Sequence, residues 1–346
     1  MHVKSRNRNS SESMNRRQFL ALASSAAAAG AATLAVPRAL AQDSTYPTRP
    51  VTLVVTYPPG SATDLMGRIV ATELSVHLGQ PVVVENKSGA GGSIGATAVA
   101  RSKNDGYTLC LGSNSTMAIN RALYRSLPYD PLKDFIPIIK TGSTPNILVV
   151  PAQSPISSTQ DLMQSMKEKK KVFQYSSSGN GTVQHLEAAL LLKQLGVSAE
   201  HVPYRSPAEQ LLAVIAGRGG DFSFGTLFGS VGYVKDGRLR GLGITSLESS
   251  RLLPEIPSLS AAGLKDFEKT NAWWGVVAPS GTPDAVIQTL HGALVKTLNS
   301  PSVQSKLNAA GFDPAPPMPA REFAQYVHEQ VAFYADLVKV SGATVD

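Results

Sequence analysis

The sequence predicts an α/β protein of two lobes, each built on a mainly parallel sheet flanked by helices. Short β-branched runs alternate with helical stretches along most of the chain, an order typical of βαβ units. The alternation begins a second time after the apolar run Asn146–Val150. Without residues 1–41, which have the features of an export signal, about 300 residues remain, enough for two domains of roughly 100–200 residues. We therefore expect one α/β block in each lobe.

Residues 1–41 have a basic, polar lead, an Ala-rich apolar run over Leu20–Val36 and a small-residue cleavage site, Ala-Leu-Ala, at 39–41. The adjacent Arg16 and Arg17 indicate a twin-arginine signal. A membrane anchor is the alternative, because the run approaches the roughly 17-residue minimum for a span. We favour a cleaved signal, since the run is mostly Ala and Gly. The mature protein is then free in the periplasm, with no membrane anchor, and we expect it to be a monomer.

Charge and composition exclude several classes of function. The whole chain carries a net charge of +7, but six basic residues and one acid lie within residues 1–41, which leaves +2 on the mature chain. This small excess gives no support to a nucleic-acid partner. The single cysteine, Cys110, cannot form an intramolecular disulfide, and its apolar neighbours predict a buried small hydrophobe. His, Cys, Asp and Glu show no metal-ligand spacing, so we expect neither a metal nor a cofactor.

The expected elements follow from these runs. Continuous β-branched runs such as Val51–Val55 are typical of strands buried on both faces, and Gly and Pro mark their ends. In the first block we expect strands at Val51–Val55, Pro81–Glu85 and Tyr107–Leu111, with helices at about Ala62–His77 and from the glycine-rich Ser88–Gly92 through Arg101. In the second block we expect strands at Asn146–Val150, Val172–Ser176, His201–Tyr204, Phe222–Phe224 and Leu239–Thr245, with helices at Ser158–Lys169, Val183–Leu195 and Ala208–Ala216. A strand at Trp273–Ala278 and helices at Pro283–Leu298, Ser302–Ala310 and Arg321–Ser341 close the chain.

Strand-to-helix joints are the candidate ligand sites, because helix N-termini there present unpaired amides and a dipole that favours anions. The first joint is Tyr57–Asp64, where Gly60 lets backbone approach a ligand closely. Ser61 and Asp64 have capping-box spacing, so ligand contact and simple helix capping both remain open.

The second joint, Ser176–Thr182, leads into a helix with His185. Its hydroxyls, two glycines and free amides can surround a carboxylate without a cation. A flexible solvated turn is the alternative for the loop, and a packed helix-face histidine is the alternative for His185. The third joint, Ser113–Thr116, gives a weaker signal.

Gly91–Gly95 matches the G-x-S-x-G pattern of hydrolases, with Ser93 as the nucleophile and Asp221 and His291 or His328 as later partners. A glycine-rich helix start gives the same pattern, and Ser93 is as readily an N-cap. We keep a secreted serine hydrolase only as a minor alternative.

A set of short motifs in order along the mature chain resembles the extracytoplasmic receptors of tripartite tricarboxylate transporters, the Bug receptor family. The motifs are Tyr57-Pro58-Pro59-Gly60 with Asp64, Gly89-Ala90-Gly91-Gly92, Asp105-Gly106-Tyr107-Thr108, Leu127-Pro128-Tyr129-Asp130, Ser178-Gly179-Asn180-Gly181 with His185, Pro203-Tyr204-Arg205, Gly237-Arg238-Leu239-Arg240 and Trp274-Gly275. The chain departs from the pattern at Ser61 and Ser206, where the family usually has glycine.

The resemblance implies a type II periplasmic-binding-protein fold with a hinged cleft, and it implies a binding protein that is not an enzyme. Lobe 1 would comprise residues 46–148 and 273–346, and lobe 2 residues 149–272. The protein would capture a small carboxylate and deliver it to a membrane permease; a periplasmic partner of a sensor kinase is the alternative. The expected ligand-binding residues are Tyr57, Gly60, Ser61, Ala62, Ser113, Asn114, Ser178, Gly179, Gly181, Thr182, His185 and Tyr204.

Overall fold

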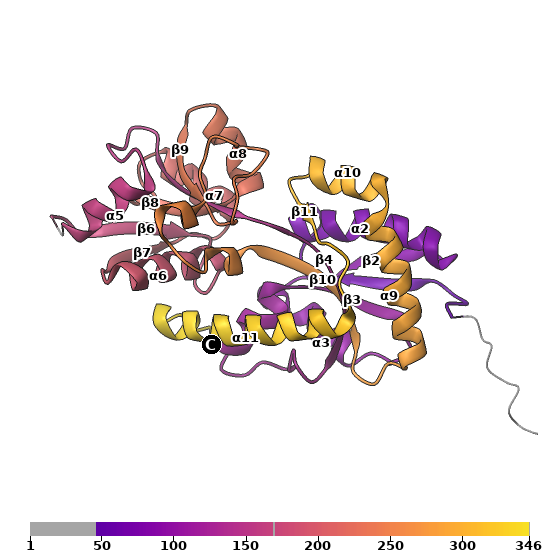
Figure 1. Cartoon of the computed structure of the whole chain (residues 1–346). Helices are drawn as coiled ribbons and strands as arrows, with labels where there is room; N and C mark the ends of the chain where they lie inside the picture. The colour runs from indigo at the N-terminus through magenta and orange to yellow at the C-terminus, as the bar shows by residue number, and fades with distance from the viewer. Residues whose placement is uncertain (1–45, 169, 346) are drawn as a thin grey trace, which may run out of the picture. The chain divides into compact units, whose positions relative to one another are not determined.

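The computed structural model describes residues 46–168 and 170–345. The predicted signal, residues 1–41, lies outside these ranges. From Tyr46 onward the chain forms one compact unit that contains two β-sheets (Figure 1). Within the described residues, no helix is both long enough and apolar enough to cross a membrane.

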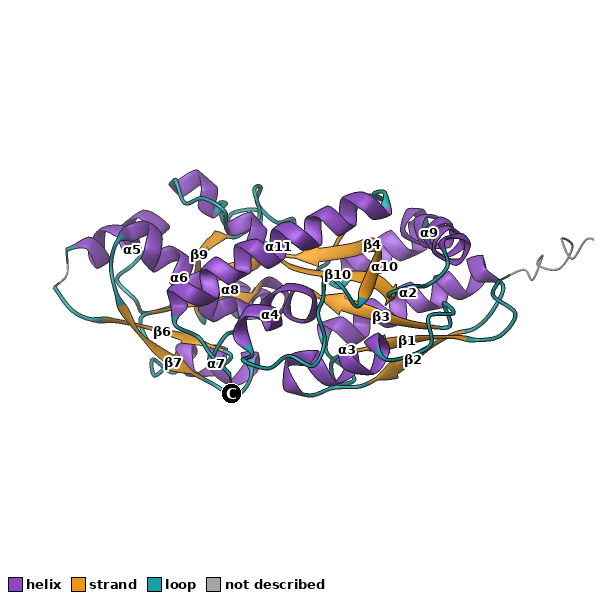
Figure 2. Ribbon diagram, turned by 90° about the horizontal axis from the view of Figure 1, so that it is seen from below, coloured by secondary structure: helices purple, strands orange, loops and turns teal. Residues whose placement is uncertain are grey.

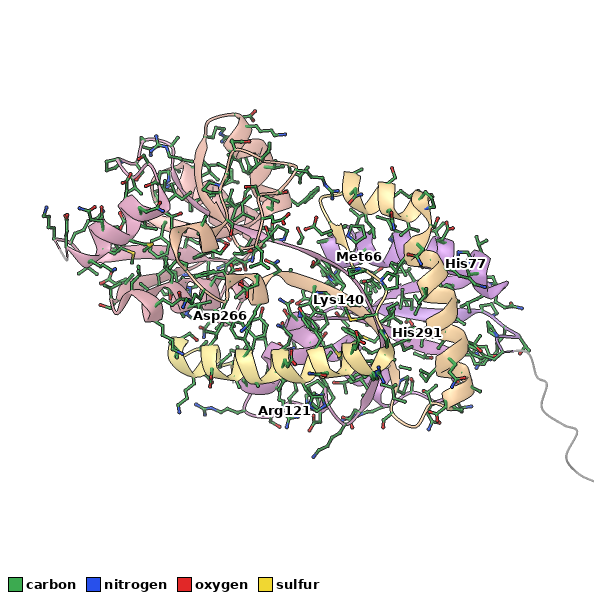
Figure 3. All side chains as sticks on the ribbon, in the orientation of Figure 1. Met66, His77, Arg121, Lys140, Asp266 and His291 are labelled. Carbon is green, nitrogen blue, oxygen red and sulfur yellow. The ribbon has the colours of Figure 1, made fainter. Side chains whose placement is uncertain are left out.

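The first sheet has six strands in the order β11-β4-β10-β3-β1-β2. They are β1 (Val51–Val55), β2 (Val82–Asn86), β3 (Thr108–Ser113), β4 (Phe135–Thr144), β10 (Ala272–Pro279) and β11 (Asp313–Pro314). Its helices are α2 (Ala62–Leu78), α3 (Ser93–Ala100), α9 (Asp284–Asn299) and α10 (Pro301–Ala309). Leu53 packs in one apolar cluster, with Met66 of α2 (Figure 3), and the next residue, Val54, packs in another with Cys110. Both faces of β1 are therefore buried, as its unbroken apolar sequence predicted.

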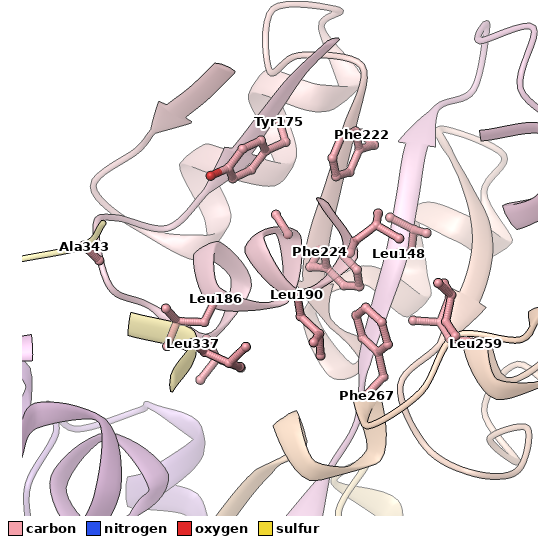
Figure 4. Packing of buried hydrophobic residues seen from close by; sticks show 14 of the residues in the cluster. Leu148, Tyr175, Leu186, Leu190, Phe222, Phe224, Leu259, Phe267, Leu337 and Ala343 are labelled. Carbon is pink, nitrogen blue, oxygen red and sulfur yellow. The ribbon is translucent and has the colours of Figure 1, made fainter. Parts of the chain in front are cut away.

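The second sheet has five strands in the order β7-β6-β8-β5-β9. They are β5 (Asn146–Pro151), β6 (Phe173–Ser177), β7 (Ala199–Pro203), β8 (Phe222–Thr226) and β9 (Leu239–Ile244). Its helices are α5 (Thr159–Lys167), α6 (Val183–Leu195), α7 (Pro207–Ile215) and α8 (Leu227–Lys235). Figure 4 shows the core beneath this sheet, where Leu186 and Leu190 of α6 lie with Phe222, Phe224 and Phe267. Residues Val183–Leu191 of α6 are all buried, including the polar Gln184, His185 and Glu187.

Both sheets are mixed and not mainly parallel. β1 pairs in parallel with β2 and β3, and β6 pairs in parallel with β7 and β8. The remaining pairs are antiparallel, because β10 returns between β3 and β4, and β5 lies between β8 and β9. The parallel pairs are those that the βαβ pattern predicted, whereas the antiparallel pairs join strands that are separated by several elements along the chain.

Several elements had no clear sequence signal. β4 is a ten-residue strand in which Pro137 pairs with Val277 at a register shift, the kind of position where a strand tolerates proline. The irregular helical segment after β3, comprising η2 (Ser115–Ile119) and α4 (Asn120–Leu123), was also not predicted. Nor were α8 and the two-residue β11.

The chain passes between the sheets at two points. Pro145 alone separates β4 from β5, and η4 (Phe267–Thr270) leads back through Asn271 to β10. The last helix, α11 (Ala320–Ser341), packs against β4, η2 and α4 of the first sheet and also against α6 of the second (Figures 1 and 2). These crossings lie close to the predicted lobe limits. That the two lobes move as rigid units with these limits stays a prediction.

Candidate ligand-binding site

The first loop is held by reciprocal capping bonds at the start of α2. Ser61 Oγ accepts the amide of Asp64 at 3.2 Å, and Asp64 Oδ2 accepts the amide of Gly60 at 2.9 Å. Helix capping by Ser61 and Asp64, one of the two alternatives, is therefore present. The amides of Ala62 and Thr63, the first two helical residues, have no intrahelical acceptor by helix geometry. These two amides are the donors that this loop can offer to an anion.

Asp64 also braces the loop from below. Its carboxylate accepts Arg68 Nε and Asn86 Nδ2, both at 2.9 Å, and Asn86 Nδ2 lies 3.0 Å from the carbonyl oxygen of Tyr57. Burial alone would raise the pKa of Asp64, but the bonds from Arg68, Gly60 and Asn86 outweigh it and lower the pKa to about 2. Asp64 is therefore ionised at neutral pH, and its carboxylate is fully engaged in bonds that hold the loop.

Tyr57 and Ser113 lie at the same edge of the first sheet. β1 and β3 are parallel with Val55 opposite Leu111, so the residues that follow emerge together. Burial raises the pKa of Tyr57, and hydrogen bonding to Ser115 and Ser113 offsets part of this rise. The Tyr57 hydroxyl therefore faces the third joint.

Asn114, also predicted as a ligand residue, has both polar groups engaged. Its Oδ1 accepts the Ser115 amide at 3.2 Å, and its Nδ2 lies 3.3 Å from the Tyr334 hydroxyl of α11. Ser113 is buried, and its amide donates to Thr116 Oγ1 at 3.0 Å. These bonds give Asn114 a clear structural role at the joint.

The second loop leads to the N-terminus of α6, which has no side-chain cap. Thr182 is the N-cap residue, but its hydroxyl donates to the Gly179 carbonyl at 2.8 Å and does not accept a first-turn amide. Ser178 Oγ likewise donates to Gln184 Oε1 at 3.0 Å. The amides of Val183, Gln184 and His185 thus lack a capping oxygen. A long helix with an uncapped N-terminus is a ready site for a carboxylate.

His185 supports this loop from inside. It is 3% exposed, and its Nδ1 accepts the Gly181 amide at 3.1 Å, which places the proton of the neutral ring on Nε2. The ring stacks on His201 with 3.9 Å between centroids. Burial, and then the proximity of His201, lower the pKa of His185 to about 4, so it is neutral at neutral pH. The geometry agrees with the packed-histidine alternative.

His201, Ser177 and Tyr175 form a support that the sequence did not reveal. Ser177 Oγ lies 2.6 Å from His201 Nε2 and accepts the Gly179 amide at 3.2 Å. Tyr175 also stacks on His201, with 4.9 Å between the ring centroids. Because His201 is 24 positions from Ser177 along the chain, only the pairing of β6 with β7 brings them together.

Tyr204 places its side chain elsewhere. Its hydroxyl donates to the Arg218 carbonyl at 2.9 Å, while its own carbonyl oxygen lies 3.6 Å from an ideal Cβ position on Gly179. Any part that Tyr204 takes in the site is therefore through its backbone.

The two loops, one from each sheet, both contact the segment 115–123. Tyr57 interacts with Ser115, as described above, and Gly181 packs on Leu123 so tightly that a Cβ there would lie 2.4 Å from Leu123 Cδ1. Only glycine fits at 181, since its φ of 72° is also left-handed. The first loop therefore contacts the third joint, and the second loop packs on α4, the helix that follows that joint.

The hydrolase alternative is wrong. Ser93 is the first residue of α3, after the N-cap Gly92, and its Oγ accepts Asn120 Nδ2 at 3.2 Å. Asp221 is bound by Lys171, and His291 on α9 (Figure 3) contacts the Met318 carbonyl at 3.0 Å. The described residues also contain no group of three or more His, Cys, Asp or Glu that could hold a metal.

Comparison with known proteins places the chain. The family model described as "Tripartite tricarboxylate transporter family receptor" matches residues 66–342. The chain belongs to this receptor family. Protein BugT of Bordetella pertussis is 32% identical to this tripartite transporter receptor over 303 residues, which cover 86% of the chain and 91% of BugT.

Two solved relatives of the receptor carry ligands. R. palustris Rpa4515 with adipate has a TM-score of 0.74 at 33% identity, covering 87% of this chain and 100% of Rpa4515. MatC of Rhodopseudomonas palustris with bound malate has a TM-score of 0.71 at 30% identity, covering 85% of this chain and 100% of MatC. These likenesses confirm the predicted two-lobed periplasmic-binding-protein fold and the prediction of a binding protein that is not an enzyme.

Proposed function

We propose that this receptor captures a small dicarboxylate or related organic acid in the periplasm and delivers it to a membrane permease. The uncapped N-terminus of α6 is the observation that carries the proposal. Three amides are unpaired there, at the positive end of the helix dipole. The loop before them is held by hydrogen bonds of Ser177, Thr182 and His185. The adipate and malate in the two solved relatives support the same class of ligand.

The opposite side of the proposed site is the α2 loop, with the amides of Ala62 and Thr63 and the hydroxyls of Ser61 and Tyr57. Arg68, the cation beside it, is committed to Asp64. A carboxylate would thus be held by dipoles and not by a paired cation. Such a site accepts an anion at a modest desolvation cost, because each donor is already oriented by the fold.

Ligand capture would also close the two lobes. An anion bridging the α2 loop and the α6 loop makes its full set of contacts only when both loops approach it, so it shifts the population toward the closed form. The lobes would be residues 46–148 with 273–346, and residues 149–272, and the closed form is the one that would dock on the permease.

Thermal melting of the mature chain with adipate and malate tests this function. At 100 times the Kd, a ligand that binds only the folded state adds about 2.7 kcal/mol. For about 300 residues this corresponds to a rise in Tm of about 4 °C. Adipamide, the uncharged analogue of adipate, serves as the control and should give no rise. Absence of a shift with every acid in a panel of mono-, di- and tricarboxylates would rule the proposal out.

Export is tested separately. Replacing Arg16 and Arg17 together by Lys should abolish periplasmic accumulation if the signal is of the twin-arginine type. An unchanged periplasmic yield would instead assign the signal to the general secretory route.

A further inference from the structure

One carboxyl group joins the three segments on which movement of the second lobe would depend. Glu187 lies on α6, two residues after His185, and is 0% exposed. Asn146 Nδ2 donates to both its oxygens, at 2.8 and 2.9 Å. Thr270 Oγ1 lies 2.8 Å from its Oε1. Asn146 begins β5 just after the crossing from β4, and Thr270 ends η4 just before the crossing to β10. Both crossings are thus tied to the helix that carries the ligand loop.

The hydrogen count at Thr270 indicates the protonation state of this carboxyl. Thr270 Oγ1 lies 2.7 Å from the Phe267 carbonyl oxygen as well as 2.8 Å from Glu187 Oε1. The hydroxyl has one hydrogen, and a carbonyl can only accept. Two full hydrogen bonds at this hydroxyl need a second hydrogen, which is available when Glu187 donates to Thr270 and Thr270 donates to Phe267. That arrangement requires Glu187 to be a neutral acid.

The electrostatic surroundings agree with a neutral acid. Burial raises the pKa of Glu187 to about 8, although the bonds from Asn146 and Thr270 offset part of the rise. None of the ion pairs formed among the described residues involves Glu187.

The neighbouring titratable groups do not supply a cation. Tyr334 of α11 faces the carboxyl, and burial raises the pKa of its hydroxyl far above the neutral range, so it is uncharged. Lys269 of η4 pairs with Asp266 at 2.7 Å. Tyr175 of β6 has a pKa raised to about 12 by burial, and His185 on the same helix is neutral, so Glu187 is isolated from positive charge.

We propose that Glu187 is a positioning residue whose proton holds α6, and with it the amides of the ligand loop, against both crossing segments. The inference rests on the proposed function for its effect on ligand binding. Ionisation at alkaline pH removes the donated bond to Thr270 and leaves a buried charge without a cation, which favours release of α6 from the crossings. The affinity for a dicarboxylate therefore falls as pH rises through the titration of Glu187. The ligand's own carboxyls are already ionised in that range.

The sign for folding is the same. The pKa of Glu187 is higher in the folded than in the unfolded chain, so the folded state binds more protons between pH values of about 4.5 and 8. The contribution of this group to stability is therefore fully present below pH 4.5 and is lost as pH rises through about 8.

Calorimetric titration with adipate from pH 6 to 9.5 tests the inference with Glu187→Gln, whose amide is neutral at every pH and can still donate to Thr270. The wild type should lose at least tenfold in affinity over this range, and Glu187→Gln should stay within twofold. Glu200→Gln, an exposed change on β7 where the carboxylate accepts Gln174 Nε2, is the matched control and should keep the wild-type profile. A tenfold loss of affinity that persists in Glu187→Gln would overturn the proposal.

Infrared titration of the unmodified protein separates this inference from the proposed function, because it needs neither ligand nor variant. A protonated-carboxyl C=O band should persist at neutral pH and disappear as pH rises above about 8. If the band is already absent at pH 6, the proposal is wrong, even if adipate binds. If the band is present but no acid binds, the function fails and the neutral carboxyl stands.

Discussion

Asp64 offers the sharpest test of how the ligand loop is held. The change Asp64→Asn keeps the size of the side chain but removes the charge that Arg68, Asn86 and the Gly60 amide share. Only 6% of the Asp64 side chain is exposed, so solvent screens its charge little, although Arg68 is half exposed.

The magnitude follows from the pKa of Asp64, which falls from 3.8 to about 2. Each pKa unit is worth about 1.4 kcal/mol, so the folded state gains roughly 2 kcal/mol from the ionised form. At an unfolding entropy of about 2 cal/mol/K per residue and about 300 residues, this is a drop in Tm of roughly 3–4 °C. The stabilisation is present above pH 4 and lost as pH falls through about 2.

Thermal melts at pH 7 and pH 2.5 check the prediction. The gap in Tm between wild type and Asp64→Asn should be several degrees at pH 7 and should narrow at pH 2.5. The control is Asp105→Asn, which removes an exposed ion pair with Arg49 and should cost under about 0.5 kcal/mol. Equal losses for the two variants, or a gap that widens in acid, would show that Asp64 does not brace the loop electrostatically.

The other predictions concern the second loop and the rejected hydrolase. Gly181→Ala should lower the free energy of unfolding in urea by about 2 kcal/mol and weaken adipate binding, because its Cβ would overlap Leu123 and its φ is left-handed; a neutral result would mean that the loop is not clamped. In a double-mutant cycle on adipate affinity, Ser177→Ala and His201→Phe should couple by about 1 kcal/mol, since His201 contacts Ser177 and Ser177 accepts the Gly179 amide. Additive effects would contradict this series of hydrogen bonds. Ser93→Ala should change neither the affinity for adipate nor the background rate of ester hydrolysis. A lower rate of ester hydrolysis in this variant would support the hydrolase alternative.

The amino-acid sequence alone was enough for the elements whose signals are local. β1 came from its β-branched run, and the start of α2 came from the spacing of Ser61 and Asp64. The βαβ alternation predicted the parallel pairs of both sheets. These features depend on neighbours within a few positions, where backbone propensity, capping and side-chain period dominate.

Tertiary structure decided the features that depend on residues far apart in the chain. The ten-residue strand β4 contains a proline and a lysine, and only its place between β10 and β11 makes it a strand. The partnership of Ser177 with His201 and the meeting of Asn146, Glu187 and Thr270 depend on strand order and helix packing. No spacing rule brings such residues together, because burial and shared hydrogen bonds act through space. The sequence therefore indicated which loops are candidates for anion binding, and the fold determined which side chains hold each of these loops in place.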